Sequence, residues 1–316
     1  MEQGAQLNPA QQEVLDLLGA TPDQRPVFDR NLRVELKAEL EAALGWVAEH
    51  IPADEDLFVS KRAIAQVMSC EAKYMAELES DFEWSIPVAR GTITHKAIEL
   101  SVHWRGEVVP LDLVDEVLAK LEFGDDNLAH WYQGIDDTDR AELRSEVNNR
   151  LVAFLETWPA LKPAWRPAVE AGVRAELAQR KLILSGKVDL ALGRATGNQA
   201  GKVIIDLKTG NFSPTHRDDL RFYALLDAIR IGTPPRMVAT YYLDRGEFTP
   251  EAITEDVLYA TVARVTDAVG RIVAVRYGGA EPETQAGPGC WWCPKLDDCP
   301  VGTAHVAIED ELADRI

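Results

Sequence analysis

Cysteine is scarce in this sequence, with four residues in a chain of 316, and long apolar runs are missing altogether. No apolar stretch approaches the roughly 18 residues that a membrane-spanning helix needs. The first residues, Met-Glu-Gln-Gly-Ala-Gln, lack the basic and apolar regions of a signal peptide. We therefore expect a cytoplasmic protein without membrane association, in which clustered cysteines more often bind metal than form disulfides.

The chain also has few basic residues relative to acidic ones. Lys and Arg number 33 against 52 Asp and Glu, which gives a formal net charge of −19. Because phosphate contacts supply most of the affinity for nucleic acids, this balance argues against a broad DNA-coating surface but permits a local basic groove. It also indicates a solvated acidic shell or docking to a basic partner. The phosphate-binding pattern G-x-x-x-x-G-K-[ST] is absent, which sets aside a helicase interpretation.

The hydrophobic periodicity changes from helical to alternating in the middle of the chain. In the first half, one predicted helix follows Ser60 as its N-cap and runs into Cys70, and another begins at Gly91. Three consecutive strands follow, the last two joined by a Gly- and Asn-rich turn. We predict an α/β (α+β) fold with a mixed central sheet flanked by helices. The expected helices cover about 11–18, 31–50, 60–70, 91–100, 111–130, 137–157, 216–231 and 255–275, and the expected strands 169–177, 182–192, 202–207 and 237–243.

Two carboxylates and a lysine stand at the ends of two predicted strands. Asp206 and Lys208 project to one side because residues two apart in a strand share a face. The predicted hairpin can place Asp189, of the sequence Gly186-Lys187-Val188-Asp189, across from them. Such a set suits a Mg²⁺ or Mn²⁺ site for phosphodiester hydrolysis, since carboxylates hold hard cations and a lysine can offset developing charge. The alternative for D-x-K at a strand end is a solvent-facing ion pair.

Two further residues could complete this site. His95 lies in the first turns of a predicted helix, four residues before Glu99 on the same face. Its imidazole could coordinate the cation beside Asp189 and Asp206, although a lone helix histidine is more often a surface or core residue. Glu170, at the start of the first strand, could add a carboxylate to the edge of the site or be an exposed strand residue.

The cysteines fall in two places far apart in the sequence. A C-x2-C-x5-C trio occupies residues 290–299, and Cys70 lies more than two hundred residues upstream. Four thiolates suit an iron–sulfur cluster or a tetrahedral zinc ion, but zinc ribbons usually take their ligands as two short pairs. The one-plus-three arrangement is unusual for zinc, and a metal site built from it would tie the two segments together as a structural staple. We expect Trp291 and Trp292 to shield it, or alternatively to stack on bases.

Taken in order, these motifs resemble the PD-(D/E)XK nuclease superfamily. More closely, they resemble its RecB-type branch with an iron–sulfur staple, which includes the nuclease domain of AddB and the CRISPR-adaptation nucleases. That branch shows a first cysteine, G-x-x-x-H, G-x-x-D, D-x-K-T-G, Q-x-x-x-Y and three final cysteines. The corresponding residues here are Cys70, Gly91 to His95, Gly186 to Asp189, Asp206 to Gly210, Asp219 to Tyr223, and Cys290, Cys293 and Cys299.

The resemblance covers about residues 57–300 and implies a role for each matching residue. It implies a restriction-endonuclease-like core with Lys208 as the catalytic lysine and Tyr223 along the DNA path. It also implies a helical N-terminal extension at 1–56, a nuclease domain at 57–305 and an acidic tail at 306–316, with a helical insertion at about 105–160 and a cluster-binding segment at 290–299. The implied metal ligands are His95, Asp189 and Asp206, and the implied ligands of a [4Fe–4S] cluster are Cys70, Cys290, Cys293 and Cys299.

Two positions depart from the family pattern. Asp219 replaces the glutamine of Q-x-x-x-Y, so a residue that usually helps to position the substrate or the lysine is an acid here. It could repel phosphate or form a salt bridge with Arg221. Glu71 follows the first cysteine where the family commonly has proline, which we interpret as a change in the local backbone and not in ligation.

The function that the resemblance implies is a Mg²⁺- or Mn²⁺-dependent DNA exonuclease acting on single strands or duplex ends. Repair, recombination or DNA processing is the expected setting, with DNA and a helicase or another repair protein as partners. The alternative is a non-catalytic subunit that keeps the fold and docks DNA or a helicase. The acidic surface and the lost glutamine favour this alternative, whereas the intact set of His95, Asp189, Asp206 and Lys208 argues against it.

Overall fold

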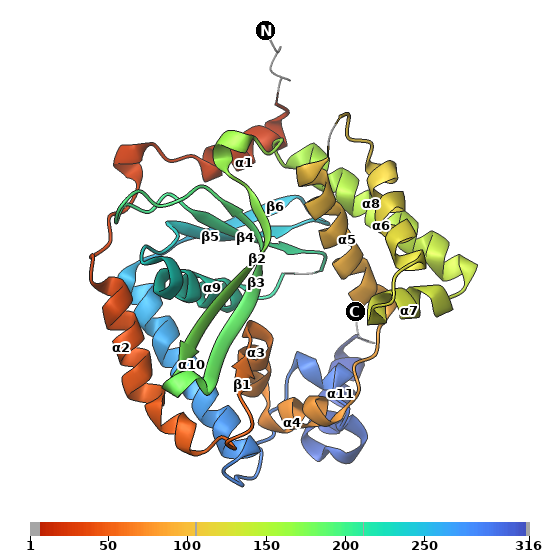
Figure 1. The fold of residues 1–316 in the computed structure, drawn as a ribbon. Helices are drawn as coiled ribbons and strands as arrows, with labels where there is room; N and C mark the ends of the chain where they lie inside the picture. The colour runs from red at the N-terminus through yellow and green to blue at the C-terminus, as the bar shows by residue number, and fades with distance from the viewer. Residues whose placement is uncertain (1–6, 105, 211, 314–316) are drawn as a thin grey trace.

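The computed structural model describes residues 7–104, 106–210 and 212–313. In this part of the chain a six-stranded mixed sheet lies at the centre, with helices on both of its faces (Figure 1). The strand order is β1-β3-β4-β5-β6, and β2 pairs with β3 along nearly its whole length. The strands are β1 (Leu57–Val59), β2 (Ala168–Leu177), β3 (Leu182–Leu192), β4 (Val203–Lys208), β5 (Met237–Tyr242) and β6 (Glu247–Ala252).

Strand β3 is the element on which the functional residues are arranged. Its first residues pair in parallel with β1, and its last residues, from Leu190 to Leu192, pair antiparallel with β4. Strand β4 then pairs in parallel with β5, which requires a crossover connection. Helix α9 (His216–Ile231) forms this crossover. The carboxyl ends of β4 and β5 therefore lie at one edge of the sheet, next to α9.

The sheet separates two hydrophobic cores. Side chains alternate along β4, so that Ile204 belongs to one core while Ile205 and Leu207 belong to the other. The first core lies beneath α2 (Leu32–Leu44), α9 and α10 (Glu255–Arg276). Helix α2 contributes leucines at every fourth position from Leu32 to Leu44, all fully buried. The residues expected to form an N-terminal extension therefore share the core of the sheet.

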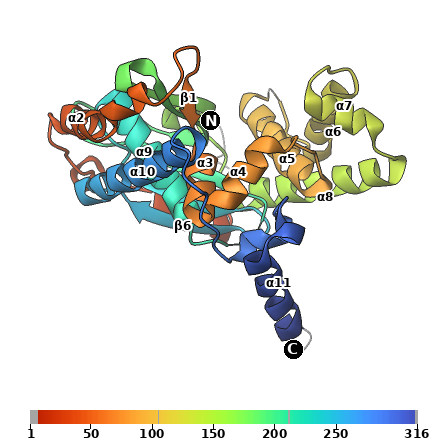
Figure 2. The same cartoon turned by 90° about the horizontal axis from the view of Figure 1, so that it is seen from below.

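The second core joins the sheet to a group of helices that projects to one side (Figure 2). Trp158 stands at the junction, with its ring 5.0 Å from that of Tyr241 on β5 and 5.8 Å from that of Phe248 on β6. This contact anchors the long helix α8 to the sheet. The helices on this side are α1 (Pro9–Leu18), α5 (Ile86–His103), α6 (Pro110–Glu122), α7 (Asn127–Gly134) and α8 (Asp137–Thr157).

The predicted fold class is confirmed, since helices flank both faces of a mixed central sheet. The predicted start of one helix at Gly91 is wrong. Helix α5 begins at Ile86, with proline in its first turn, and Gly91 lies in its second turn. A β-carbon on Gly91 would meet Thr209 Oγ1 at 3.2 Å, so the glycine allows α5 to approach the end of β4 closely. His95 consequently lies in the middle of α5 and not in its first turns.

Other element boundaries differ for local reasons. The single helix expected at 111–130 is two helices, because Asp126 caps a new one at Asn127. The helix expected at 31–50 gives way to a 3₁₀ turn after Leu44. Helix α3 (Lys61–Ser69) follows its Ser60 cap as expected. Four elements were not predicted, namely β1, α4 (Glu71–Glu79), β6 and α11 (Pro300–Ala313). Helix α11 crosses the boundary expected between the domain and an acidic tail. No helix in the described ranges is long and apolar enough to cross a membrane.

Candidate active site

The antiparallel pairing of β3 with β4 brings the two predicted carboxylates together. Leu190 pairs with Ile205, so the preceding Asp189 lies beside Asp206. The backbone N–H of Leu207 donates a hydrogen bond of 2.7 Å to Asp189 Oδ2. This bond fixes the Asp189 side chain at the end of β4, between the two helical layers.

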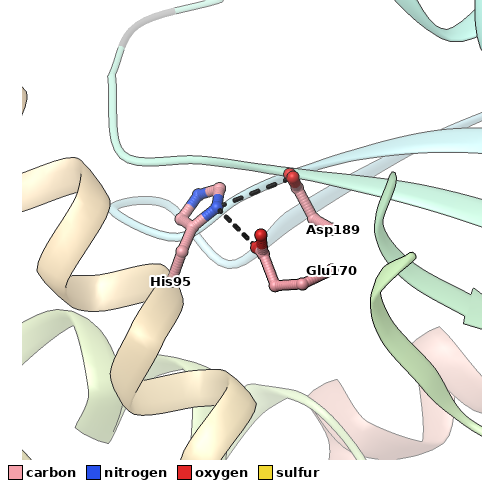
Figure 3. Close-up of side chains that lie close together, drawn as sticks. All are labelled: His95, Glu170 and Asp189. Atoms are coloured by element: carbon pink, nitrogen blue, oxygen red, sulfur yellow. Dashed lines mark ion pairs between the residues drawn. The ribbon is translucent and has the colours of Figure 1, made fainter. Parts of the chain in front are cut away.

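His95 reaches the same point from α5. Its Nε2 lies 2.9 Å from the carbonyl oxygen of Leu207, and a carbonyl only accepts, so Nε2 carries a proton. Its Nδ1 then faces two carboxylates, at 3.6 Å from Asp189 Oδ1 and 3.8 Å from Glu170 Oε1 (Figure 3). The backbone of β4 therefore holds both His95 and Asp189 through a single residue, Leu207.

Glu170 enters this group with an unusual backbone conformation. The register between β2 and β3 places it opposite Asp189, and its φ angle is 52°. A non-glycine residue in the left-handed region carries a cost of about 1–2 kcal/mol. Such strain concentrates at functional sites, where it directs a side chain. Here the Glu170 carboxylate is aimed at His95 and at Lys187, whose Nζ lies 2.5 Å from Glu170 Oε2.

Burial and charge shift the pKa values of this group in opposite directions. Burial disfavours the charged imidazole of His95, but Glu170 and Asp189 outweigh this effect and raise its pKa. His95 and Lys187 together lower the pKa of Glu170 to about 2. Burial first and the negative charge of Asp206 second raise the pKa of Asp189 to about 6. The raised pKa of Asp189 therefore reflects a buried carboxylate held next to the negative charge of Asp206, a repulsion that a bound cation would relieve.

His95, Glu170 and Asp189 fit a divalent metal ion. One ligand atom from each lies within 4.8 Å of the others, and among the described residues no other group of three His, Cys, Asp or Glu residues meets this condition. Because the proton is on Nε2, the Nδ1 atom of His95 is the ligand that faces the carboxylates. The two carboxylates supply the oxygen ligands that hard cations such as Mg²⁺ and Mn²⁺ prefer. Glu170 thus lies with the residues expected to bind metal.

Asp206 has a different environment, with a lysine at each oxygen. Lys61 Nζ lies 2.7 Å from Oδ1 and Lys208 Nζ lies 2.8 Å from Oδ2, and the carboxylate is only 1% exposed. Burial opposes the charged carboxylate, but the two lysines prevail and hold the pKa of Asp206 well below its usual range. The Lys208 contact lacks hydrogen-bond geometry, so Oδ2 has no hydrogen-bond donor among the described residues. That oxygen faces the Lys208 ammonium, so Asp206 lies beside the group of His95, Glu170 and Asp189 and not within it.

Lys61 is the site residue that the sequence analysis missed. It is the first residue of α3, directly after the Ser60 cap, and the parallel pairing of β1 with β3 places it beside the end of β4. Its contact with Asp206 spans 145 positions of the chain. The helix start at Ser60 was visible in the sequence, but no pattern there indicates that a distant strand lies beside it.

The helix that carries Asp219 and Tyr223 packs behind this ion-pair cluster. Asp219 lies 3.8 Å from Lys61 and 4.0 Å from Lys208, and burial raises its pKa. The salt bridge between Asp219 and Arg221, one of the two possibilities for Asp219 in the sequence, is not formed. Arg221 instead binds Glu251, on β6, and Asp218.

Tyr223, which the resemblance implied along the DNA path, is 3% exposed. Its ring lies under Lys61, with Nζ 4.8 Å from the ring centre. A β-carbon on Gly186 would overlap the same ring, which gives a packing reason for the glycine of G-x-x-D. The burial of Tyr223 favours a supporting role behind Lys61 over direct exposure to a strand of DNA.

A cleft opens beside these residues on the α5 side. It has a volume of about 390 Å³ and is lined by His95, Lys208 and His216, together with the loop from Thr209 to Gly210 and the start of α5. His216 Nδ1 lies 3.0 Å from the hydroxyl of Tyr242. Burial and the positive charge of Lys208 lower the pKa of His216 to about 4, so this ring is neutral at pH 7. The cleft gives a phosphodiester access to Lys208.

The four cysteines line a separate cavity of about 290 Å³. Cys70 lies between α3 and α4, and the trio lies in the 3₁₀ turns before α11. A tetrahedral zinc ion would hold its thiolates about 3.8 Å apart, given a Zn–S distance of about 2.3 Å. No three of these sulfur atoms lie within 4.8 Å of one another. All four thiols nevertheless line one cavity, which makes it a candidate site for a metal ion or a cluster.

Glu71 ties the same two segments together without a metal. Its carboxylate accepts a hydrogen bond of 3.0 Å from the backbone N–H of Glu283, and the backbone N–H of Ala72 donates to the carbonyl of Glu283. Arg271 on α10 lies 3.5 Å from the other carboxylate oxygen. A proline at position 71 could not make the side-chain contacts. Of the two tryptophans expected to shield the cysteines, Trp291 is 42% and Trp292 is 76% exposed.

Comparisons with known proteins give one family and structural likenesses of low sequence identity. No curated protein matches the sequence significantly. A crystal structure of a candidate exonuclease from Eubacterium rectale is 14% identical, with 77% of this chain and 88% of that chain covered and a TM-score of 0.48. The protein SSO0001 is also 14% identical, with 84% of this chain and 96% of that chain covered and a TM-score of 0.33. The family model of the PD-(D/E)XK nuclease superfamily matches residues 59–300, which include every site residue from Lys61 to Cys299, and the chain belongs to this superfamily.

Proposed function

We propose that this protein is a divalent-metal-dependent deoxyribonuclease that degrades DNA from ends, on single strands or duplexes. The observation that carries the proposal is the convergence of His95, Glu170 and Asp189 beside Asp206 and Lys208 at the edge of one cleft. PD-(D/E)XK nucleases use divalent metals, and this donor set suits Mg²⁺ or Mn²⁺. DNA repair, recombination or DNA processing is the setting that we propose, with a helicase or another repair protein as a partner.

The residues of the site have different roles in the proposed phosphodiester hydrolysis. His95, Glu170 and Asp189 would hold the ion, which supplies Lewis acidity and lowers the pKa of a bound water. Lys208 lies beside the cleft with its charge held 2.8 Å from Asp206, where it can orient a water or offset the charge that develops on the phosphate. Leu207 keeps the histidine and Asp189 in register through its backbone N–H and carbonyl.

We further propose a structural [4Fe–4S] cluster bound by the four cysteines. The cavity that all four cysteines line supports it. The cysteine cavity lies between α4 and the segment before α11, and it shares no lining residue with the active-site cleft. This separation supports a role in holding the fold and not in cleavage.

A strand-labelled degradation assay tests the nuclease. The wild type is expected to shorten linear DNA in Mg²⁺ or Mn²⁺, to leave closed circles intact and to stop in EDTA. Lys208→Ala is expected to lose at least about a hundredfold in rate, the scale of one lost transition-state contact. Lys96→Ala is the matched control, because Lys96 follows His95 on α5 but is exposed. Equal rates for wild type and Lys208→Ala would overturn the assigned site, and binding without degradation would support a non-catalytic subunit.

A further inference from the structure

A second polar cavity lies at the opposite end of the same strands. Its volume is about 410 Å³, and it is bounded by the end of α1, the 3₁₀ turn at Pro163–Trp165 and the segments that start β4 and β5. Strand β4 runs from Val203 at this cavity to Lys208 at the active site. At about 3.3 Å per residue, five steps separate the two places by about 17 Å. The cavity is therefore distinct from the active-site cleft.

Four arginines line this cavity, namely Arg25, Arg166, Arg194 and Arg236. In a chain with 52 acidic residues, such a concentration of positive charge would ordinarily be balanced by carboxylates. No carboxylate of the described residues lies within ion-pair distance of any of the four, whereas Arg150, Arg221 and Arg271 each pair with at least one. These four guanidinium groups therefore have no paired carboxylate among the described residues and can bind an anionic ligand.

Two of the arginines are held in place by backbone oxygens. Arg236 donates to the carbonyl of Leu18, the last residue of α1, and Arg25 Nε donates to the carbonyl of Ala20 at 3.3 Å. Burial first and the nearby charge of Arg25 second lower the pKa of Arg236, so the two cations lie close together without an anion between them. A guanidinium has five N–H donors, so each retains donors for a ligand.

The other two arginines have no partner within the described residues. Arg166 and Arg194 are exposed, and their side chains take part in no hydrogen bond or ion pair there. Arg166 also has a φ angle of 51°, the strained left-handed conformation. A β-carbon on Gly201 would overlap the carbonyl oxygen of Arg194 and come within 3.2 Å of Arg25 Nη1. The glycine therefore lets the backbone at Arg194 pack closely against residue 201, beside the guanidinium of Arg25.

The remaining wall is apolar and includes a flat aromatic ring. It is formed by Leu15, Leu18, Trp165, Leu192 and Val203. A small inorganic anion would satisfy the arginines but leave this wall uncovered. A nucleobase has the flat, apolar face that such a wall accommodates, and the volume lies in the range of small-molecule sites. Arginine is the residue that best binds phosphate, through paired N–H donors.

We propose that this cavity binds a nucleotide, with its phosphate held by the four arginines and its base against Trp165 and the leucines. The nucleotide is either a free mononucleotide or the phosphorylated end of a DNA strand, since both present the same chemistry. The site is independent of the proposed nuclease chemistry, because it needs neither the divalent ion nor Lys208.

Calorimetric titration in EDTA tests this site without cleavage. The probes are dAMP, deoxyadenosine, and a short single strand with and without a 5′-phosphate. We expect the wild type to bind dAMP or the phosphorylated strand and not to bind deoxyadenosine. Tight binding of dAMP identifies a free-nucleotide site. Preference for the phosphorylated over the unphosphorylated strand, without dAMP binding, identifies a strand end.

The variant Arg166→Ala/Arg194→Ala is expected to bind the successful probe at least about tenfold more weakly, since each lost charge-assisted bond is worth about one such factor. Its matched control is Arg30→Ala/Arg33→Ala, which removes the same charge from two exposed arginines that do not line the cavity. The single variant Arg194→Ala serves if the double variant does not fold. The proposal is overturned if the wild type binds no phosphorylated probe, or if the cavity variant and the control bind it equally.

Discussion

Lys61 Nζ lies 2.7 Å from Asp206 Oδ1, so the first residue of α3 neutralises a carboxylate at the end of β4. Lys208 takes the other oxygen of Asp206, and Asp219 lies within 4.0 Å of both lysines. Two lysines and two acids thus balance one another in a buried cluster. The balance explains the acid at position 219, where the family pattern has glutamine. A neutral residue there would leave one of the two lysine charges without compensation.

Replacing Lys61 should strengthen divalent-metal binding. The lysine competes for Asp206, and its charge also repels a cation a few ångströms away, an interaction of at least about 1.4 kcal/mol at the dielectric of a partly buried site. We therefore expect Lys61→Met to bind Mn²⁺ at least about tenfold more tightly than the wild type in calorimetric titration. Lys96→Met, an exposed lysine on α5, is the control and should leave the affinity unchanged. An unchanged affinity in Lys61→Met would show that Lys61 does not compete with the ion.

Glu170 should be needed for the ion even though the sequence motif does not include it. It faces His95 Nδ1 at 3.8 Å, and its strained backbone directs it there. We expect Glu170→Gln to weaken Mn²⁺ binding by at least about tenfold, the typical loss on removing part of a metal site. Glu99→Gln makes the same charge change on α5, one turn beyond His95, and lies outside the three-residue group. Equal affinities in the two variants would exclude Glu170 as a ligand.

These residues show which parts of the site a sequence can reveal. Asp189, Asp206 and Lys208 were predicted together because the two-residue period and a short hairpin turn are local features. The position of Lys61 depends on a parallel pairing between β1 and β3, which are more than a hundred residues apart. The arginine cavity likewise draws on segments from α1 to β5. Contacts of that range follow from the packing of the whole sheet, and no local period encodes them.

Some element boundaries were also missed although they depend on local features of the sequence. The break between α6 and α7 follows from one capping residue, Asp126, whose side chain accepts from the N–H of Ala129. Capping of this kind is readable from sequence, but the apolar spacing continued across it and favoured one helix. Strand β6 contains Pro250 and lies at the edge of the sheet, where a missing N–H is tolerated. The polar composition of β6 lacks the alternating apolar pattern from which a strand is predicted.

Removing Cys70 should remove the cluster and weaken the fold. The staple would close a loop of more than two hundred residues, and its loss restores that freedom to the unfolded chain. We expect Cys70→Ser, purified without oxygen, to lose the broad visible absorbance and the bound iron of the wild type and to unfold at a lower temperature. Glu71→Ala should also unfold at a lower temperature, because its bond to Glu283 is lost, but it should keep its colour. Zinc in place of iron in the wild type, or colour in Cys70→Ser, would contradict the assignment.

Acidification from pH 6.5 toward pH 4 should destabilise the protein through His216. Burial and Lys208 lower the pKa of His216 to about 4, from an ordinary value of 6.5 in the unfolded chain. Between these values the unfolded state binds a proton that the folded state does not, so stability is lost as the pH falls from 6.5 toward 4. We expect the unfolding temperature to fall more between pH 7 and pH 4.5 in the wild type than in His216→Gln. The glutamine has no titrating ring but can still form a hydrogen bond with Tyr242. Parallel profiles for the two proteins would show that His216 makes no contribution to this acid sensitivity.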